Sequence, residues 1–419
     1  MFFCSRLCAG AFCAETTNLG FFEVSIGVAH DRDMHPYRDI TFFARANHRN
    51  AGTLFGIRRT DRRNHMYMIG KTGTGKSTLL KTLVRQDIAA GEGLALFDPH
   101  GDLAEEIVSL VPAVRRADLI YLNVPDQSFV WHFNPFADVP KEKHALATAG
   151  MVEVFKKLWP DEWGPRLEHL LRNVVFTLLE AGDATFADIP RLLSNREYRG
   201  AMVKKVSNAM VREFWEKEFA GYSPAFRAVV TAPLLNKVGA FLTDPLLHSI
   251  LNGARSSFDL RRIMDEGKIL VVNLAKGKLG EGPAALLGSL LVSHLSLAAM
   301  ERADRPHEDR RDFYLYLDEF HTFATLTLAT MLSELRKYRL NLILAHQYLS
   351  QLETEVRDAV FGNAGTFVTF RVGALDAPTV ARELSPTFEA DDLLSLPNFS
   401  VYLRLMIEGE PSKPFSAWT

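Results

Sequence analysis

One loop pattern constrains the fold of this chain more than any other feature. The pattern G-x-x-x-x-G-K-[ST] occupies Gly70–Ser77, directly after the apolar run His65–Ile69 and at the start of the helical pattern Lys76–Ala90. Glycines let the backbone curl so that successive N–H groups face a phosphate, and the helix start adds the positive end of its dipole. A loop of this kind joins a strand to a helix in nucleotide-binding α/β domains.

The same loop predicts which residues hold a nucleotide. We expect Lys76 to reach the β- and γ-phosphates of ATP, and Ser77 to offer its hydroxyl to Mg²⁺. The predicted cofactors are therefore ATP and Mg²⁺. The residues expected to bind the nucleotide are Gly70, Thr72, Gly73, Thr74, Gly75, Lys76, Ser77 and Thr78. The alternative, a glycine-rich turn without a ligand, is disfavoured by the apolar strand and the amphipathic helix on either side.

Short apolar runs, each bounded by Gly, Pro or Asp, recur from His65 onward. Near-continuous apolarity suits central strands that helices cover on both faces. Helical patterns separate most of these runs, so we predict a mostly parallel, doubly wound α/β sheet. The predicted strands are His65–Ile69, Leu94–Phe97, Leu119–Leu122, Ile269–Leu274, Phe313–Leu317, Leu340–Ala345, Phe367–Phe370 and Val401–Leu405.

The stretch between Asn134 and Gly267 carries helical patterns throughout. Its amphipathic runs are Lys141–Leu158, Arg166–Ala181 and Glu197–Phe219. We predict an all-α insertion of roughly 110–130 residues, within the usual size of a domain. The expected organisation is a small N-terminal segment at 1–60, partly β (Phe21–Val28 and Ile40–Phe43), a first core part at 61–138, the insertion at 139–262 and a second core part at 263–419.

An acidic pair follows one of the predicted central strands. Asp318 and Glu319 come directly after Phe313–Leu317. We expect Asp318 to hold the Mg²⁺ shell and Glu319 to polarise the attacking water, which favours hydrolysis over phosphate transfer to another acceptor. Two carboxylates at a buried strand end are costly without a cation. The alternative is a strand end whose carboxylates are held in salt bridges.

Two further polar residues are candidates for catalysis. Gln347 follows the strand Leu340–Ala345 and could sense the γ-phosphate or position water; otherwise it caps a turn. Arg336 precedes that strand, on the rim of the domain, where it could stabilise the transition state in a neighbouring subunit of a ring. The competing interpretation of Arg336 is solvated basic surface. Arg371, which closes Phe367–Phe370, is the reserve candidate.

Charge and composition limit the partners. The 419 residues are 47% hydrophobic and 23% charged, which excludes a disordered or fibrous chain. With 48 Lys and Arg against 50 Asp and Glu, the net charge is −2, so any polyanion partner needs a local basic surface. Lys276 and Lys278, in a glycine-rich loop that we expect to be mobile, are the candidates for contact with the phosphates of such a partner. A solvated turn is the alternative.

Cysteine usage and apolar length bear on location. The three cysteines, Cys4, Cys8 and Cys13, fit neither a zinc pattern nor a disulfide framework, which indicates a reducing, intracellular environment. The longest apolar stretch, Ala284–Met300, is shorter than the ~20 residues that cross a bilayer and suits a buried helix. We therefore expect no membrane span, and a cytoplasmic location, free or peripheral to the inner membrane.

The order of these motifs resembles one family. The runs GKTGTGKSTLL, FDPHGDL (Phe97–Leu103), YLDEFHTF (Tyr316–Phe323) and LSELRKYRLNLILAHQYLSQL (Leu332–Leu352) are similar to those of FtsK/HerA-type ring ATPases. Within that group the sequence most resembles the type IV secretion, TraG/TraD-like conjugative coupling proteins and their soluble relatives. The resemblance covers roughly residues 55–405.

This resemblance implies a RecA-like core, homo-hexamers around a central pore, ATP hydrolysis at subunit interfaces and DNA translocation. It gives Lys76, Ser77, Asp318, Glu319 and Gln347 the roles above and makes Arg336 act in trans. A secretion channel, a relaxase or a nuclease is the implied partner. His321 and Thr322 could couple hydrolysis to the pore or only pack their loop. The rival functions are a ring ATPase that moves proteins and a nucleotide-switched assembly scaffold.

Overall fold

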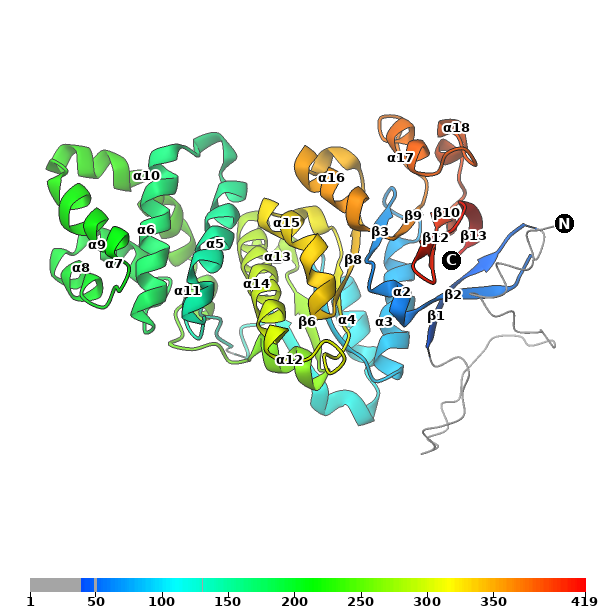
Figure 1. Ribbon diagram of the computed structural model, residues 1–419, viewed down its shortest axis with the longest axis horizontal. Coiled ribbons are helices and arrows are strands. Elements are labelled where there is room, and N and C mark those ends of the chain that lie inside the picture. The colour runs from blue at the N-terminus through cyan, green and yellow to red at the C-terminus, as the bar shows by residue number, and fades with distance from the viewer. Residues whose placement is uncertain (1–38, 49–50, 130) are drawn as a thin grey trace.

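The computed structural model describes residues 39–48, 51–129 and 131–419. The expected strand Phe21–Val28 and the three cysteines lie outside these residues. One sheet of 11 strands forms the centre of the described chain, with the strand order β2-β1-β13-β10-β9-β3-β8-β7-β4-β6-β5. Figure 1 shows this sheet running from the middle of an elongated molecule to the end where β1 and β2 lie, with helices on both of its faces.

The seven strands from β9 to β5 in that order all run parallel to their neighbours. They are β3 (Met66–Ile69), β4 (Gly93–Asp98), β5 (Leu119–Asn123), β6 (Ile269–Asn273), β7 (Phe313–Leu317), β8 (Leu340–His346) and β9 (Thr366–Thr369). Each predicted strand of this part is present to within one residue at either end. The predicted fold class is confirmed.

Apolar side chains cover both faces of the parallel strands because successive residues point to opposite sides. In β3, Met66 and Met68 pack in the cluster under α3 (Lys76–Ala89) and α4 (Asp102–Leu110), whereas Tyr67 and Ile69 belong to the larger cluster on the other face. That second face is covered by α14 (Glu281–Glu301), α15 (Leu326–Leu335) and α16 (Thr354–Asn363).

The sheet continues on one side with antiparallel strands. These are β10 (Ser400–Arg404), β13 (Phe415–Trp418), β1 (Ile40–Ala46) and β2 (Leu54–Arg58). The patterns at Ile40–Phe43 and Val401–Leu405 predict β1 and β10, but no pattern predicts β2 or β13. A separate hairpin pairs β11 (Met406–Ile407) with β12 (Glu410–Pro411). The remaining helices of the core are α2 (Arg59–Arg62), α13 (Lys276–Leu279), α17 (Ala377–Glu383) and α18 (Ala390–Leu394).

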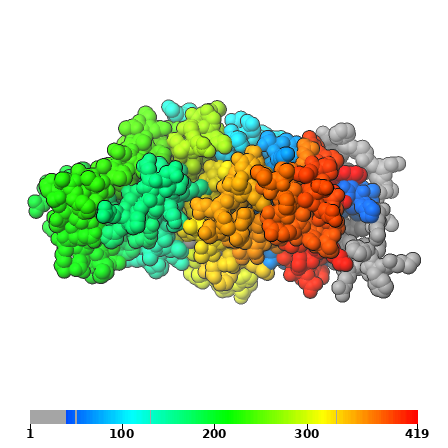
Figure 2. All heavy atoms as spheres, turned by 90° about the horizontal axis from the view of Figure 1, so that it is seen from above, coloured from blue at the N-terminus to red at the C-terminus, as the bar shows by residue number. Residues whose placement is uncertain are grey.

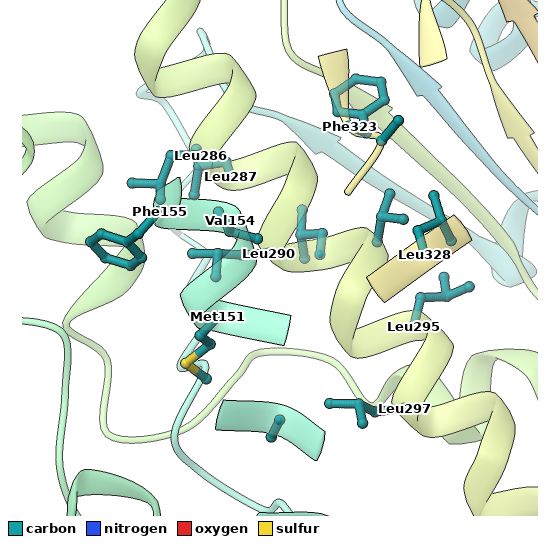
Figure 3. Packing of buried hydrophobic residues seen from close by; sticks show 14 of the residues in the cluster. Met151, Val154, Phe155, Leu286, Leu287, Leu290, Leu295, Leu297, Phe323 and Leu328 are labelled. Carbon is teal, nitrogen blue, oxygen red and sulfur yellow. The ribbon is translucent and has the colours of Figure 1, made fainter. Parts of the chain in front are cut away.

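The chain between β5 and β6 is helical and forms one end of the molecule (Figures 1 and 2). Its helix α5 packs against α14 of the core, and Figure 3 shows Met151, Val154 and Phe155 of α5 facing Leu287 and Leu290 of α14. The helices are α5 (His144–Leu158), α6 (Pro165–Ala181), α7 (Asp188–Ser194), α8 (Arg196–Val203), α9 (Ala209–Glu213), a π-helix (Phe214–Phe219), α10 (Pro224–Leu242), α11 (Pro245–Leu251) and α12 (Leu260–Glu266).

The prediction of one amphipathic run over Glu197–Phe219 is wrong. The run is divided into α8, α9 and the π-helix, with a break before Ala209. The Asn208 side chain accepts hydrogen bonds from the backbone N–H groups of Met210 and Val211, which caps a new helix there.

Among the residues that the structure describes, two helices have the length and apolarity of a membrane span. One is α10; the other is α14 with the turn after it, Glu281–Asp304. The apolar window of α14 is 89% buried, as expected for a core helix that covers a sheet. The prediction of a buried helix at Ala284–Met300 is confirmed.

Acidification is expected to weaken the fold through His65, whose side chain joins helix α15 to strand β8. Its Nε2 donates to the Leu332 carbonyl (2.9 Å), and its Nδ1 accepts from the Leu342 N–H (3.1 Å). Burial lowers the pKa of His65 from 6.5 to about 4. The fold therefore needs the neutral ring, so its contribution, about 3 kcal/mol, is complete above pH 6.5 and is lost progressively as the pH falls from 6.5 through 4.

The test is chemical denaturation at pH 7 and pH 4.5, with His65→Asn as the variant. Asparagine tolerates the left-handed backbone at this position (φ 62°) and does not titrate. We expect the variant to lose less stability than the wild type between the two pH values. Equal losses would contradict this role of His65.

Candidate nucleotide site

The loop after β3 has the shape of a phosphate cradle. Gly73 and Gly75 have φ of +75° and +119°, where side chains are strained. A Cβ on Gly75 would lie 3.0 Å from the Phe399 ring, and one on Gly70 would lie 2.5 Å from Cβ of Phe370. Around Gly73, by contrast, nothing lies within 4 Å of the Cβ position. Phe370 and Phe399 therefore pack closely against the loop backbone at Gly70 and Gly75, while the loop is open at Gly73. This shape fits a bound phosphate chain.

Lys76 lies between this loop and the acidic pair. Its Nζ donates to the carbonyls of Gly70 (2.5 Å) and Lys71 (3.1 Å), and the residue is only 6% exposed. Burial lowers the pKa of Lys76, while the nearby Glu319 and Asp318 raise it. The ammonium group is thus placed where phosphate charge is expected.

The other predicted residues of the loop differ in their exposure. Thr72, Ser77 and Thr78 are exposed, so their hydroxyl groups are accessible to a ligand. Thr74 is buried, and its hydroxyl donates to the Lys71 carbonyl (2.7 Å). Thr74 therefore shapes the loop with its side chain and can offer a ligand only its backbone.

Asp318 and Glu319 follow β7 and reach the same edge of the sheet as the loop. Both are 5% exposed. The pKa of Asp318 is raised to about 7, first by burial and then by the neighbouring Glu319 and Asp98. A carboxylate destabilised in this way is relieved by a cation. Among the described residues, no lysine or arginine forms an ion pair with either carboxylate, so the salt-bridge alternative finds no support.

Glu319 is held by its backbone and by Gln347. Its φ of +45° is unusual for a residue other than glycine. Oε1 accepts a hydrogen bond from Nε2 of Gln347 (2.7 Å), while Oε2 is buried and has no hydrogen-bond partner within the described chain. Nδ1 of His321 lies 3.5 Å from Oε2. Burial and nearby lysines lower the pKa of His321 to about 4, so the ring is neutral at pH 7 and forms no ion pair.

The site contains residues that the sequence patterns do not indicate. Oε1 of Gln351 accepts from the N–H groups of Gln347 and Tyr348, which fixes the turn that presents Gln347. Asp98, at the end of β4, accepts from the N–H groups of His100 and Ala104 and so caps α4 beside the acidic pair. Asp98 lies in the run Phe97–Leu103 and Gln351 in the run Leu332–Leu352. Their contacts form only in the folded chain, so the sequence does not indicate their roles.

Arg336 is not part of this cluster. It lies before β8, at the opposite edge of the sheet from Gln347, about 20 Å away at ~3.3 Å per strand residue. It is exposed and lines two hollows of about 440 and 420 Å³, one of which also contains Arg63 and Lys337. The reserve candidate Arg371 donates to the Leu396 carbonyl and to Oδ1 of Asn398, so its guanidinium group is already hydrogen-bonded within its own chain. In the described parts of the chain, nothing pairs with the Arg336 guanidinium.

Comparison with known families decides which protein class this geometry belongs to. The model of the type IV secretion-system coupling protein DNA-binding domain matches residues 49–384. The chain belongs to this family. The family expected from the sequence is thereby confirmed. No curated protein matches the chain in sequence.

Several solved structures share the fold of this chain. The plasmid coupling protein TrwB with a non-hydrolysable ATP analogue is 17% identical, with a TM-score of 0.60 over 87% of this chain and 86% of that one. TrwB with ADP and Mg²⁺ is 18% identical, with the same TM-score and 87% of each chain covered. VirB4 of Thermoanaerobacter pseudethanolicus is 14% identical, with a TM-score of 0.59 over 90% of this chain and 95% of that one. The ligands of the two TrwB structures, an ATP analogue and ADP with Mg²⁺, are of the class that the phosphate loop predicts for this chain.

The prediction of a mobile loop around Lys276 and Lys278 is wrong. These residues form the one-turn helix α13. Oδ1 of Asn273 accepts from the Ala275 N–H, and the Lys276 N–H donates to the Pro99 carbonyl, which together start the turn. Both side chains remain at the carboxyl edge of the sheet, with Lys276 half-buried and Lys278 exposed. Thr322 is buried and packs its loop, since its carbonyl accepts from Ser289.

Proposed function

We propose that this chain is an ATP-hydrolysing motor that binds and translocates DNA as a homo-hexamer. The observation that supports it best is the placement of Glu319, fixed by Gln347, at the same edge of the sheet as Lys76 and the open phosphate loop. Membership of a family described by its DNA-binding domain supports DNA as the substrate.

The proposed chemistry assigns one task to each residue. The backbone of Gly70–Gly75 and the Lys76 ammonium bind the phosphates. Ser77 and Asp318 would hold Mg²⁺, which neutralises phosphate charge when bound. Oε2 of Glu319, which lacks a partner in the described chain, is free to accept a proton from the attacking water while Gln347 holds Oε1. Arg336 serves the site of the neighbouring subunit, because it lies too far from its own.

We further propose that the unit 139–262 contacts DNA or a partner, which would be a secretion channel, a relaxase or a nuclease. We place the activity in the cytoplasm, where ATP is available. Lys276 and Lys278, which follow β6 at the carboxyl edge of the sheet, are the residues that we propose to contact DNA.

ATP turnover is expected to rise when DNA is added, and this stimulation should weaken steeply as salt increases, because phosphate contacts release counterions. The measurement compares turnover with no DNA, with single-stranded DNA and with double-stranded DNA. Lys276→Ala/Lys278→Ala should lower the stimulation, and Lys81→Ala/Lys268→Ala, which lies outside the helical insertion, is the matched control for losing two lysines. ATP turnover that does not change when DNA is added would favour a motor for protein substrates. ATP binding without turnover would favour a nucleotide-switched scaffold.

A further inference from the structure

A lysine of the helical insertion reaches the loop that follows the acidic pair. Lys157 lies in the last turn of α5, and its Nζ donates to the carbonyls of His321 (2.5 Å) and Ala324 (2.7 Å). Burial lowers the pKa of its amine to about 7, which Glu353 partly opposes. The neutral amine still has two N–H donors, so the contact does not require the charge.

The loop that Lys157 contacts is otherwise fixed from the core side. A Cβ on Gly288 of α14 would lie 2.3 Å from the Phe323 ring, so this ring sits directly on the α14 backbone. Figure 3 shows Phe323 on one side of α14 and Met151, Val154 and Phe155 of α5 on the other. The loop therefore has two supports: α14 from the core, and Lys157 from the insertion.

The same loop sets the position of Glu319. The Glu319 carbonyl accepts from the Thr322 N–H (2.8 Å), and the Phe320 carbonyl accepts from the N–H groups of Phe323 and Ala324. These bonds form a tight turn that begins at the strained Glu319. Within the described chain, the carbonyls of His321 and Ala324 accept their hydrogen bonds from Lys157. A shift at the end of α5 would therefore move the turn and, with it, the carboxylate.

We infer that Lys157 is a positioning residue that couples the helical insertion to the nucleotide site. The inference rests on the proposed function for its direction: a partner bound to the insertion changes hydrolysis through Lys157, and nucleotide binding changes the end of α5 through the same contact. Such coupling is necessarily reciprocal for binding. A misplaced general base costs turnover without costing ATP affinity.

The test uses three variants of the full chain. Lys157→Met keeps the apolar stem and removes the donor, Lys157→Arg restores a donor, and Lys156→Met changes the neighbouring lysine, which pairs weakly with Glu153 (3.7 Å). For Lys157→Met we expect kcat to fall by about 10²-fold, with KM and the melting temperature nearly unchanged. Lys157→Arg should recover most of the loss, and Lys156→Met should equal the wild type. Wild-type kcat in Lys157→Met, or an equal loss of ATP affinity, would overturn the inference.

Hydrogen exchange separates this inference from the proposed function, because it needs no turnover. In the wild type, a non-hydrolysable ATP analogue with Mg²⁺ should change exchange at both 319–325 and 155–159. In Lys157→Met the change at 155–159 should disappear while that at 319–325 remains. If the two segments respond together in the variant as well, Lys157 does not couple them. An inactive wild type whose segments respond as expected would refute the motor and retain the coupling.

Discussion

Glu319→Gln is expected to bind ATP with nearly wild-type affinity and to lose 10²–10⁴-fold in turnover, about the contribution of a positioned general base. The amide has the same shape as the carboxylate and can keep the contact with Gln347, but it cannot take a proton from water. The amide NH₂ group of the glutamine would take the place of Oε2 of Glu319, a buried atom that has no hydrogen-bond partner in the described chain. Steady-state turnover and the Kd for ATP, measured on the same preparation, test this expectation.

Glu106→Gln provides the matched control for the loss of one carboxylate. Glu106 lies on α4, where it pairs with Lys81 at the surface (2.6 Å), so its turnover should equal that of the wild type. Wild-type turnover in Glu319→Gln would remove Glu319 from the mechanism.

Arg336→Ala is expected to lose 10³–10⁵-fold in turnover, the range known for arginines that act on a phosphoryl group from another chain. The site of each subunit would keep its own Glu319 and lose the cation of its neighbour. Mixing Arg336→Ala with Glu319→Gln subunits should restore part of the turnover, because some interfaces then combine an intact Glu319 with an intact Arg336. Turnover of the two variants, alone and mixed, is the measurement.

Lys337→Ala is the control for this second experiment, since Lys337 pairs with Glu334 in its own chain (2.8 Å). Its turnover should be unchanged, alone or in mixtures. If mixed rings form and no turnover returns, Arg336 does not act across an interface.

The parallel strands other than the edge strand β5 could be predicted because each is buried on both faces. A run such as Phe313–Leu317 stays apolar at every position when clusters cover both sides of the sheet. The strand Phe415–Trp418 has no such signal, since its burial is mixed and its partners, β1 and β10, are set by distant parts of the chain. The break before Ala209 did have a local signal, the Ser-Asn pair ahead of a helix, which periodicity alone ignores.

The candidate site was predictable to the extent that its residues follow strand ends. Lys76, Asp318 and Gln347 meet because β3, β7 and β8 are parallel neighbours whose carboxyl ends share one edge. The contact of Lys157 with His321 could not be predicted, because it joins positions 164 residues apart through the packing of α5 on α14. Glycine at 277 suggested a flexible loop, but hydrogen bonds to the Asn273 side chain and to the Pro99 carbonyl, which follows β4, start the helix α13 there.

The place of β13 has a consequence for the synthesis of the protein. This strand, at the carboxyl end of the chain, lies between β10 and β1 and pairs with both. The early hairpin of β1 and β2 therefore has no strand to join until residues 415–418 have emerged from the ribosome. The nucleotide-binding strands can assemble during translation, but the antiparallel border of the sheet can close only once the chain has been made through Trp418.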